Sequence, residues 1–261
     1  MRFDVITLFP ELLTPFVSSG INRRAFETGA VELKLWQLRD YADGAYRRVD
    51  DRPFGGGPGM VMLAEPLEKC LQAIRQDRSV SSPSKPNAPV VLFSPIGQKL
   101  DHAGVETWSQ SDGAILICGR YEGLDQRFID AHVDVQISLG DFVLSGGEIA
   151  AIALLDAVAR LQPGVLNDEG SHQMDSFNPA LNGLLDCGHY TRPERWHDAT
   201  VPPVLMSGHH ADIATWRRQQ SLALTQKHRP DLIEVARARG QLSPKDEHFL
   251  AHLPASTQTD S

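Results

Sequence analysis

The sequence has little of several features that mark common protein classes. Its three cysteines, Cys70, Cys118 and Cys187, are an odd number without Cys-x-x-Cys spacing, which is typical of a reduced cytosolic protein and not of a disulfide framework or a structural zinc site. It lacks the long apolar run that a membrane-spanning helix needs. Residues 1–5 begin directly as a strand and do not have the layout of a signal peptide. We therefore expect a cytoplasmic protein without a membrane segment.

An excess of positive charge is also missing. The 261 residues include 25 Lys+Arg and 33 Asp+Glu, a formal net charge of −8 at pH 7, so the chain has no overall basic field for nucleic acid. Basic residues do cluster locally, as at Arg217-Arg218, although each cluster alone is more often a solvated face. Because a phosphate backbone needs only a local positive surface, the net charge argues against RNA binding without excluding it.

Motifs of several large enzyme classes are absent. The sequence has no Gly-x-Ser-x-Gly elbow and no His-Glu-x-x-His helix. The glycine-rich segment 50–60 has no Gly-Lys-Ser/Thr and is therefore not a P-loop. No Gly-x-Gly-x-x-Gly follows the first expected strand, which argues against a Rossmann site. Cys187 and His189 make only a weak metal pair, so any metal-binding residues remain unknown.

What the sequence does have is a region, residues 90–148, in which three apolar runs each lead into a glycine-containing loop. The runs cover residues 90–93, 114–118 and 133–138. The first two are almost continuously apolar and the third alternates, and helical segments lie between them, which predicts parallel strands with their loops at one edge of an α/β sheet. Because glycine allows a close approach of the backbone to a ligand, the loops favour a small-molecule pocket lined by main chain. Ordinary turns in an α/β core are the alternative that the pattern leaves open.

The rest of the chain extends this α/β region and adds a helical one. Further strands are expected over residues 3–8 and 31–38, and helices from Pro10 and over residues 66–78 and 148–161. Residues 39–59 form a polar loop, which is either a flap over a site or a surface loop, and residues 79–89 a flexible connector. Beyond a polar segment at 163–178, helices are expected over residues 210–227, 230–239 and from Pro244, which follows the N-cap residue Ser243.

Several short motifs occur in a fixed order along nearly the whole chain. They are DRPFGGGPGM (51–60), SPIG (94–97), CGRYEG (118–123), GDFVLSGGE (140–148), PGVL (163–166), DSF (175–177), HYTRP (189–193) and VPPVL (201–205). With these motifs the chain resembles the bacterial tRNA (guanine-N1)-methyltransferases of the knotted SPOUT superfamily. Each motif alone is weak, and the resemblance rests on their number and order.

The resemblance implies an α/β fold with a mostly parallel sheet flanked by helices, a deep trefoil knot over about residues 90–148, and a smaller, mainly helical C-terminal domain. Knots are otherwise nearly absent from proteins, and periodicity does not reveal one. The implied domains are a methyltransferase domain at 1–162, a linker at 163–178, a tRNA-binding domain at 179–253 and a disordered tail at 254–261. It also implies a homodimer with the active site at the subunit interface, where the linker of one subunit covers the pocket of the other.

S-adenosylmethionine is the cofactor that the resemblance implies, held by the three loops. By position its contacts are Leu92, Phe93, Ser94, Pro95, Gly97, Gly119, Tyr121, Glu122, Leu139, Gly140, Asp141, Phe142, Val143, Leu144, Gly146 and Gly147. Mg²⁺ is a further implied cofactor for which no residue identifies a site. Phe142, Ile96, Gly188 and His209 depart from the family's usual residues, and the segments 79–89 and 178–180 look like insertions. These departures remove no catalytic candidate.

The implied reaction is methylation of N1 of guanosine 37 of tRNA, just 3′ of the anticodon, and it supports maintenance of the reading frame. The family's catalytic residues map onto Asp175, a base for the N1 proton, and Arg160, a cation for the charge that moves to O6. Taken alone, Asp175 is more simply a loop carboxylate and Arg160 a residue at a helix C-terminus. The expected tRNA surface consists of Arg192, Arg195, Arg217, Arg218, Lys227 and Arg229.

Two other functions remain open on the sequence. One is a SPOUT methyltransferase that acts on another RNA site, such as a ribose or a base of rRNA. The other is a non-catalytic RNA-binding protein that has kept the fold. The presence of both Arg160 and Asp175 argues against the second.

Overall fold

The computed structural model describes residues 1–81, 87–166 and 171–253. They belong to two compact units, Met1–Asn167 and Asp168–Ser261, and we describe each unit by itself. The boundary between the units falls inside the expected linker at 163–178. The expected tail at 254–261, residues 82–86 of the expected connector and residues 167–170 of the linker lie outside the described residues.

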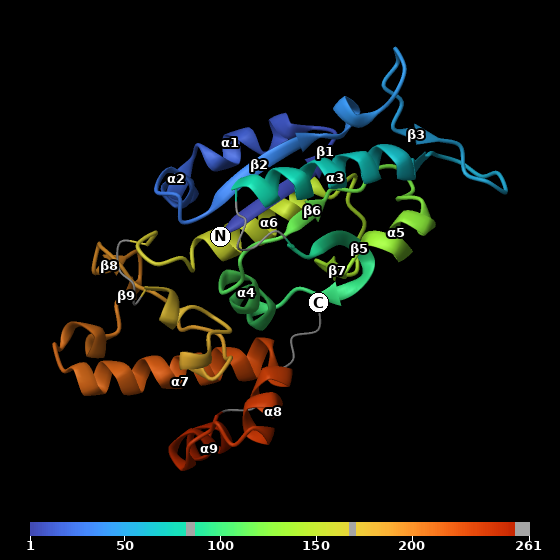
Figure 1. Ribbon diagram of the computed structural model, residues 1–261. Helices are drawn as coiled ribbons and strands as arrows, with labels where there is room; N and C mark the ends of the chain where they lie inside the picture. The colour runs from blue at the N-terminus through green and yellow to red at the C-terminus, as the bar shows by residue number, and fades with distance from the viewer. Residues whose placement is uncertain (82–86, 167–170, 254–261) are drawn as a thin grey trace. The chain divides into compact units, whose positions relative to one another are not determined.

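The first unit is built on a five-stranded sheet (Figure 1). Its strands, in spatial order, are β2 (Glu32–Gln37), β1 (Arg2–Thr7), β6 (Ile115–Ile117), β5 (Val90–Lys99) and β7 (Val135–Ser138). All neighbouring strands are parallel. This confirms the expected parallel sheet, and it explains the continuous apolar runs, because β6 is buried along its whole length and β5 is buried over its first three residues.

Strand β5 differs from expectation by continuing through residues 94–97, which we predicted to be a loop. Its pairing with β7 shifts register between Phe93 and Gln98. An extra stretch of chain in one strand of a pair bends that strand and turns its side chains in a new direction. The segment Ser94–Gly97 therefore belongs to β5 but does not pair regularly with β7.

Helices cover both faces of the sheet. On one side, residues of α6 (Glu148–Ala159), α2 (Gly20–Glu27) and α4 (His102–Ser109) pack with Phe3 and Val5 of β1. On the other side, α3 (Ala64–Ser81) and α5 (Gln126–His132) pack with Ile6 and with β6. Figure 1 shows α3 and α6 on opposite sides of the strands. The short helix expected at Pro10 is a 3₁₀ turn, Pro10–Leu12, followed by α1 (Thr14–Val17).

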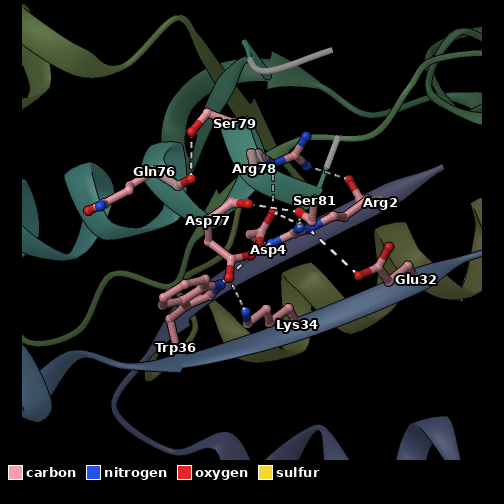
Figure 2. A network of polar contacts seen from close by, with 10 residues as sticks. All are labelled: Arg2, Asp4, Glu32, Lys34, Trp36, Gln76, Asp77, Arg78, Ser79 and Ser81. Carbon is pink, nitrogen blue, oxygen red and sulfur yellow. Dashed lines mark hydrogen bonds and ion pairs between the residues drawn. The ribbon is translucent and has the colours of Figure 1, made fainter. Parts of the chain in front are cut away.

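A polar network is buried against β1 (Figure 2). Asp4 is fully buried, and its carboxylate accepts hydrogen bonds from Arg2 (2.6 Å), Trp36 (2.8 Å) and Arg78 (2.6 Å). Asp77 also pairs with Arg2, at 2.7 Å. Because a buried carboxylate is tolerated only when it is paired and hydrogen-bonded, this network fixes β1, β2 and the end of α3 to one another.

The long polar loop of the first unit is a two-stranded ribbon, β3 (Asp50–Asp51) and β4 (Val61–Met62). Figure 1 shows the chain around β3 extending away from the sheet. Its aromatic residues Tyr46 and Phe54 are almost fully exposed. The ribbon is therefore paired at its base, whereas the aromatic side chains of this segment are exposed to solvent.

The second unit is mainly helical in its described part. Its elements are the 3₁₀ turns η3 (Ser171–Met174), η4 (Pro179–Leu181) and η5 (Pro203–Met206), the hairpin β8 (Arg195–Trp196) and β9 (Ala199–Thr200), and the helices α7 (His210–His228), α8 (Pro230–Ala238) and α9 (Pro244–Ala251). Leu184, Leu222, Ile233 and Ala236 form its core. Over the described ranges of both units, no helix is long and apolar enough to cross a membrane.

Candidate functional site

A cavity of about 400 Å³ lies in the first unit, where β6 and β7 end and beside the shifted part of β5. Cavities that hold small molecules have volumes of roughly 300–1,000 Å³. The carboxyl edge of a parallel sheet is the usual place for such a site in α/β proteins. The edge predicted from the three loops is therefore hollowed to the size of a small-molecule site.

Fourteen of the sixteen predicted cofactor contacts line this cavity. They are Leu92, Phe93, Ser94, Pro95, Gly119, Tyr121, Glu122, Leu139, Gly140, Phe142, Val143, Leu144, Gly146 and Gly147. The structure thus brings the three loops together, and cofactor binding by these residues stays a prediction.

Gly97 and Asp141 do not line the cavity. A Cβ atom at position 97 would lie 2.5 Å from the backbone of Gln136 and Ile137, so this glycine permits the close packing of β5 on β7. Asp141 is exposed and its carboxylate lies 3.6 Å from the Lys99 ammonium. Both positions belong to the frame around the cavity.

Several lining residues were missed by the sequence analysis. Arg120, Gly123, Leu124 and Ser145 stand beside predicted residues in the same loops, whereas Gln126 and Ile129 come from α5 and Gln136 to Ser138 from β7. Neighbours in a loop are a signal that sequence provides. The contribution of α5 and of the strand itself depends on how the chain folds back on the sheet, which the sequence pattern does not give.

The loops approach each other through their backbones. The Gly147 N–H donates to the Gly119 carbonyl at 2.9 Å, and a Cβ atom at position 147 would lie 2.7 Å from Cα of Cys118. Tyr121 adopts a φ of 60°, a conformation that costs a non-glycine residue on the order of 1 kcal/mol. Position 147 therefore requires glycine because the two loops approach each other closely there, and not because of its backbone dihedral angles.

A buried ion pair links two of the loops. Arg120 Nη1 donates to the Ser145 carbonyl (3.2 Å), and Arg120 Nη2 lies 2.8 Å from Oε2 of Glu148. Oε1 of Glu148 accepts a hydrogen bond from the Thr7 hydroxyl (2.8 Å). The guanidinium also lies over the Phe9 ring, 4.5 Å from its centroid. The pair thus joins β1, the loop after β6 and the start of α6.

The described residues that line the cavity include two charged side chains. They are Arg120 and Glu122, and Arg120 is neutralised by Glu148. The nearby Cys118 thiol is fully buried, and burial together with the Glu148 carboxylate raises its pKa well above the ordinary value. The cavity therefore favours a cationic ligand, and Cys118 stays a neutral thiol.

The end of the glycine-rich segment lies against the same loops. The Met60 carbonyl accepts from the Glu122 N–H (3.0 Å), and the Met62 N–H donates to the Gly123 carbonyl (2.9 Å). A Cβ atom at Gly59 would overlap the Glu122 side chain. Of the two interpretations of this segment, its position beside the cavity favours a cover over the site.

The two catalytic candidates belong to different units. Arg160 follows α6 in the first unit, and its N–H donates to the Asp156 carbonyl at 3.2 Å. Asp175 lies between η3 and η4 of the second unit, where its N–H donates to the His172 carbonyl and its carbonyl accepts from the Asn178 N–H. Neither unit brings the two together by itself, and their roles stay predictions.

The six predicted tRNA-binding cations fall into two groups. Arg218 makes a two-pronged pair with Asp246, Arg229 one with Asp231, and Arg195 a long contact of 3.9 Å with Asp198. Within the described part of the second unit, Arg192, Arg217 and Lys227 have no carboxylate within ion-pair distance. The second group is better suited to phosphate, because its guanidinium and ammonium groups are not already neutralised.

The weak Cys187–His189 metal pair is not a metal centre in this structure. The His189 ring nitrogen Nε2 lies 2.8 Å from the Asp186 carboxylate. Nowhere in residues 1–81, 87–166 and 171–253 do three or more His, Cys, Asp or Glu side chains gather so that they could hold a metal ion.

Comparison with known proteins gives a consistent result. The family model described as tRNA (Guanine-1)-methyltransferase TrmD matches residues 1–235. A Polaromonas protein named tRNA (guanine-N(1)-)-methyltransferase is 69% identical over 261 residues, which is 100% of both chains. Proteins of the same name from Paracidovorax citrulli (69% identical, 97% of this chain and 98% of the relative) and Bordetella pertussis (53%, 99% and 100%) are similar along their whole length.

Proposed function

The chain belongs to the tRNA (guanine-1)-methyltransferase TrmD family and is a tRNA (guanine-N1)-methyltransferase, and from this premise we propose that it methylates guanosine 37 with S-adenosylmethionine. The product is 1-methylguanosine next to the anticodon, where the methyl group supports maintenance of the reading frame. The cavity of the first unit is the cofactor site in this proposal, and the reaction takes place in the cytoplasm.

The observation that carries the cofactor assignment is the chemistry of the cavity. S-adenosylmethionine has an adenine ring, a ribose, an amino acid group and a positive sulfonium. Backbone groups of three loops offer donors and acceptors, and Leu92 and Leu144 offer apolar surface. Of the two charged residues among the described ones that line the cavity, Arg120 is neutralised by Glu148, which leaves the negative charge of Glu122. The residues present therefore fit this cofactor.

The reaction needs a base and a cation near the guanine. Guanine N1 carries a proton and is a poor nucleophile while it does. In the proposal, Asp175 accepts this proton as the new N1–carbon bond forms. Arg160 stabilises the negative charge that moves to O6, and positioning of the base supplies much of the remaining acceleration. The bound cofactor supplies a methyl group that is already activated by its sulfonium.

We further propose three features that are known for the family: a trefoil knot over about residues 90–148, a C-terminal domain that binds tRNA, and a homodimer in which the linker of one subunit covers the pocket of the other. They are supported by the family membership and by the unbroken similarity to relatives. Sedimentation analysis of the purified chain tests the dimer, and a titration of activity with EDTA and Mg²⁺ tests the metal requirement.

The decisive experiment is methyl transfer from labelled S-adenosylmethionine to a tRNA transcript, compared with the same transcript in which adenosine replaces the guanosine after the anticodon. We expect label only in the guanosine transcript, recovered as 1-methylguanosine. Equal label in both would move the target to another RNA site. Asp175→Asn is the matched variant: it should lose nearly all transfer and bind the cofactor as the wild type does, and unchanged turnover would refute the assignment of the base.

A further inference from the structure

The second unit has a cavity of its own, with about half the volume of that in the first. Its volume is about 210 Å³, and it is lined by Gly188, His189, Tyr190, Val201, Leu205, Ile213, Trp216 and Arg217. We propose that this cavity holds one unpaired nucleotide of the tRNA, with its base against Tyr190 and Trp216 and its phosphate at Arg217. The inference rests on the proposal that the second unit binds tRNA.

Three chain segments converge to build the cavity. Ile213, Trp216 and Arg217 stand three and four residues apart on α7, so they share one face of that helix. Gly188 to Tyr190 precede the β8–β9 hairpin, and Val201 and Leu205 follow it. The rings of Tyr190 and Trp216 meet edge to face, with centroids 6.0 Å apart. The aromatic surface is therefore held from two independent segments.

The size and surface of the cavity suit a nucleobase. Complete small-molecule sites have roughly 300–1,000 Å³, so about 210 Å³ is room for a fragment such as one planar base. Tyr190 is 52% exposed, although a large aromatic ring gains by burial. Base-on-aromatic stacking is the way in which proteins commonly bind unpaired nucleotides, because every base has a flat π-face.

The edge of the cavity suits a phosphate. Arg217 is exposed, and no carboxylate of the described residues lies within ion-pair distance of it, whereas the adjacent Arg218 is held by Asp246. A guanidinium without such a partner can take a phosphate through two parallel hydrogen bonds. His189 also lines the cavity, oriented by its contact with Asp186.

The net charge of the second unit permits the binding of a phosphate. Residues 171–253 carry nine Lys and Arg and nine Asp and Glu, whereas the whole chain has a net charge of −8. This part of the chain is therefore neutral where the rest is acidic. Asp175, the base in the proposed reaction, does not line the cavity, so the nucleotide held here is not the one that is methylated. Its role is to set the register of the tRNA on the protein.

The first test separates stacking from size at Tyr190. Tyr190→Phe keeps the ring and Tyr190→Leu keeps apolar bulk without it. We expect Tyr190→Leu to weaken the Kd for a tRNA transcript about tenfold, within the range measured for one stacked base, and to raise KM with kcat unchanged. Tyr190→Phe should bind within about twofold of the wild type, on the same stacking argument. Equal affinity of both variants and the wild type would overturn the site.

The second test concerns the phosphate. Arg217→Ala should lower the slope of log Kd against log salt by about 1, as the loss of one phosphate contact does. Arg239→Ala removes the same charge from an exposed position of the second unit that no carboxylate of the described residues pairs, and it should leave the slope unchanged. Equal slopes for both variants would mean that only general charge is felt and would refute the contact.

A third measurement compares the wild type with Tyr190→Leu. Chemical modification of unpaired bases of the tRNA should show one nucleotide, other than the methylated guanosine, that the protein protects and Tyr190→Leu does not. Absence of such a nucleotide would overturn the proposal. The melting temperature of each variant, measured in parallel, distinguishes a lost contact with tRNA from misfolding of the protein. Methylation of the transcript by the wild type tests the proposed function separately, so a failure of the subsite and a failure of the enzyme assignment are distinguishable.

Discussion

Arg120 and Glu148 form an ion pair that is almost wholly removed from solvent, with side chains 17% and 1% exposed. The two residues stand at opposite sides of the loops that line the cavity, Arg120 after β6 and Glu148 at the first position of α6. Through Arg120, the Ser145 carbonyl is fixed as well. The pair therefore holds the loop 119–123 and the loop 139–147 at a set distance from each other.

Glu148→Gln tests whether this pair positions the cofactor loops. The amide keeps the shape of the side chain and leaves the Arg120 charge buried without its partner, which costs about 3 kcal/mol in the free energy of unfolding. We also expect weaker binding of S-adenosylmethionine by calorimetry, because the two loops lose their common contact.

Thr7→Val is the matched control for Glu148→Gln. It removes the hydrogen bond that the Thr7 hydroxyl donates to Oε1 of Glu148 and the one that it accepts from the Phe9 N–H, so the loss of stability should be about 2 kcal/mol and the ion pair should persist. Cofactor affinity unchanged in Glu148→Gln, with stability reduced as expected, would show that the pair only supports the fold.

Replacement of Arg160 tests the second catalytic candidate. If its guanidinium stabilises charge at O6, Arg160→Ala should lower kcat by about 10²–10³, as removal of one such donor does, and Arg160→Lys should lose less. The Kd of the cofactor should not change. A fall in kcat that follows a fall in melting temperature across both variants would contradict the catalytic role and assign Arg160 to the stability of the α6 terminus.

The contact between Arg218 and Asp246 makes the stability of the second unit sensitive to acid. Burial raises the pKa of Asp246, but hydrogen bonds from Arg218 and Ser243 outweigh it, so the net pKa lies below the ordinary value. A carboxyl group whose pKa is lowered in the folded state contributes stability above its unfolded pKa of about 3.9 and loses it as the pH falls through the folded pKa. We expect the melting transition of the second unit to fall with pH below about 4.

Arg218→Ala should reduce this acid sensitivity and cost about 1–2 kcal/mol at neutral pH, a value discounted for the partial exposure of Arg218. Asp246→Asn removes the titrating group and should flatten the pH dependence further. A pH profile of Asp246→Asn that matches the wild type below pH 4 would assign the acid sensitivity to other groups. Because Arg218 has this structural role, its removal is expected to weaken tRNA binding only through instability.

The sequence predicted the sheet and the cavity well because both follow from local rules. Apolar runs become strands, and loops after parallel strands meet at one edge, so positions such as Gly119 and Gly146 were found. Contacts made across the sheet were not found. Asp4 interrupts an apolar strand, and nothing in its neighbourhood shows that Trp36 and Arg78 satisfy it. Likewise Glu148 was predicted only as the start of a helix, since its pairing with Arg120 depends on the path of the chain between β6 and α6.

Gly97 illustrates the same limit and gives the last prediction. The resemblance assigned this glycine to the cofactor, whereas in the structure a Cβ atom there would lie 2.5 Å from the backbone of β7. Real Cβ contacts with backbone are longer, and neither strand can move without opening the sheet. Gly97→Ala should therefore reduce the free energy of unfolding by roughly 3 kcal/mol, at the upper end for overpacking, and should weaken cofactor binding because β5 and β7 both line the cavity.

Gly104→Ala is the control in the same unit with the opposite expected sign. Gly104 lies in the first turn of α4, and its Cβ atom would meet side-chain atoms only: Leu100 Cδ1 at 3.3 Å and, at 3.4 Å, Oδ1 of the N-cap residue Asp101. Alanine is favoured over glycine within a helix by about 0.5–1 kcal/mol, so this variant should be as stable as the wild type or more so. Urea unfolding of both variants gives the comparison. If Gly97→Ala kept wild-type stability and lost only cofactor binding, the glycine would be required by the ligand and not by the packing of β5 on β7.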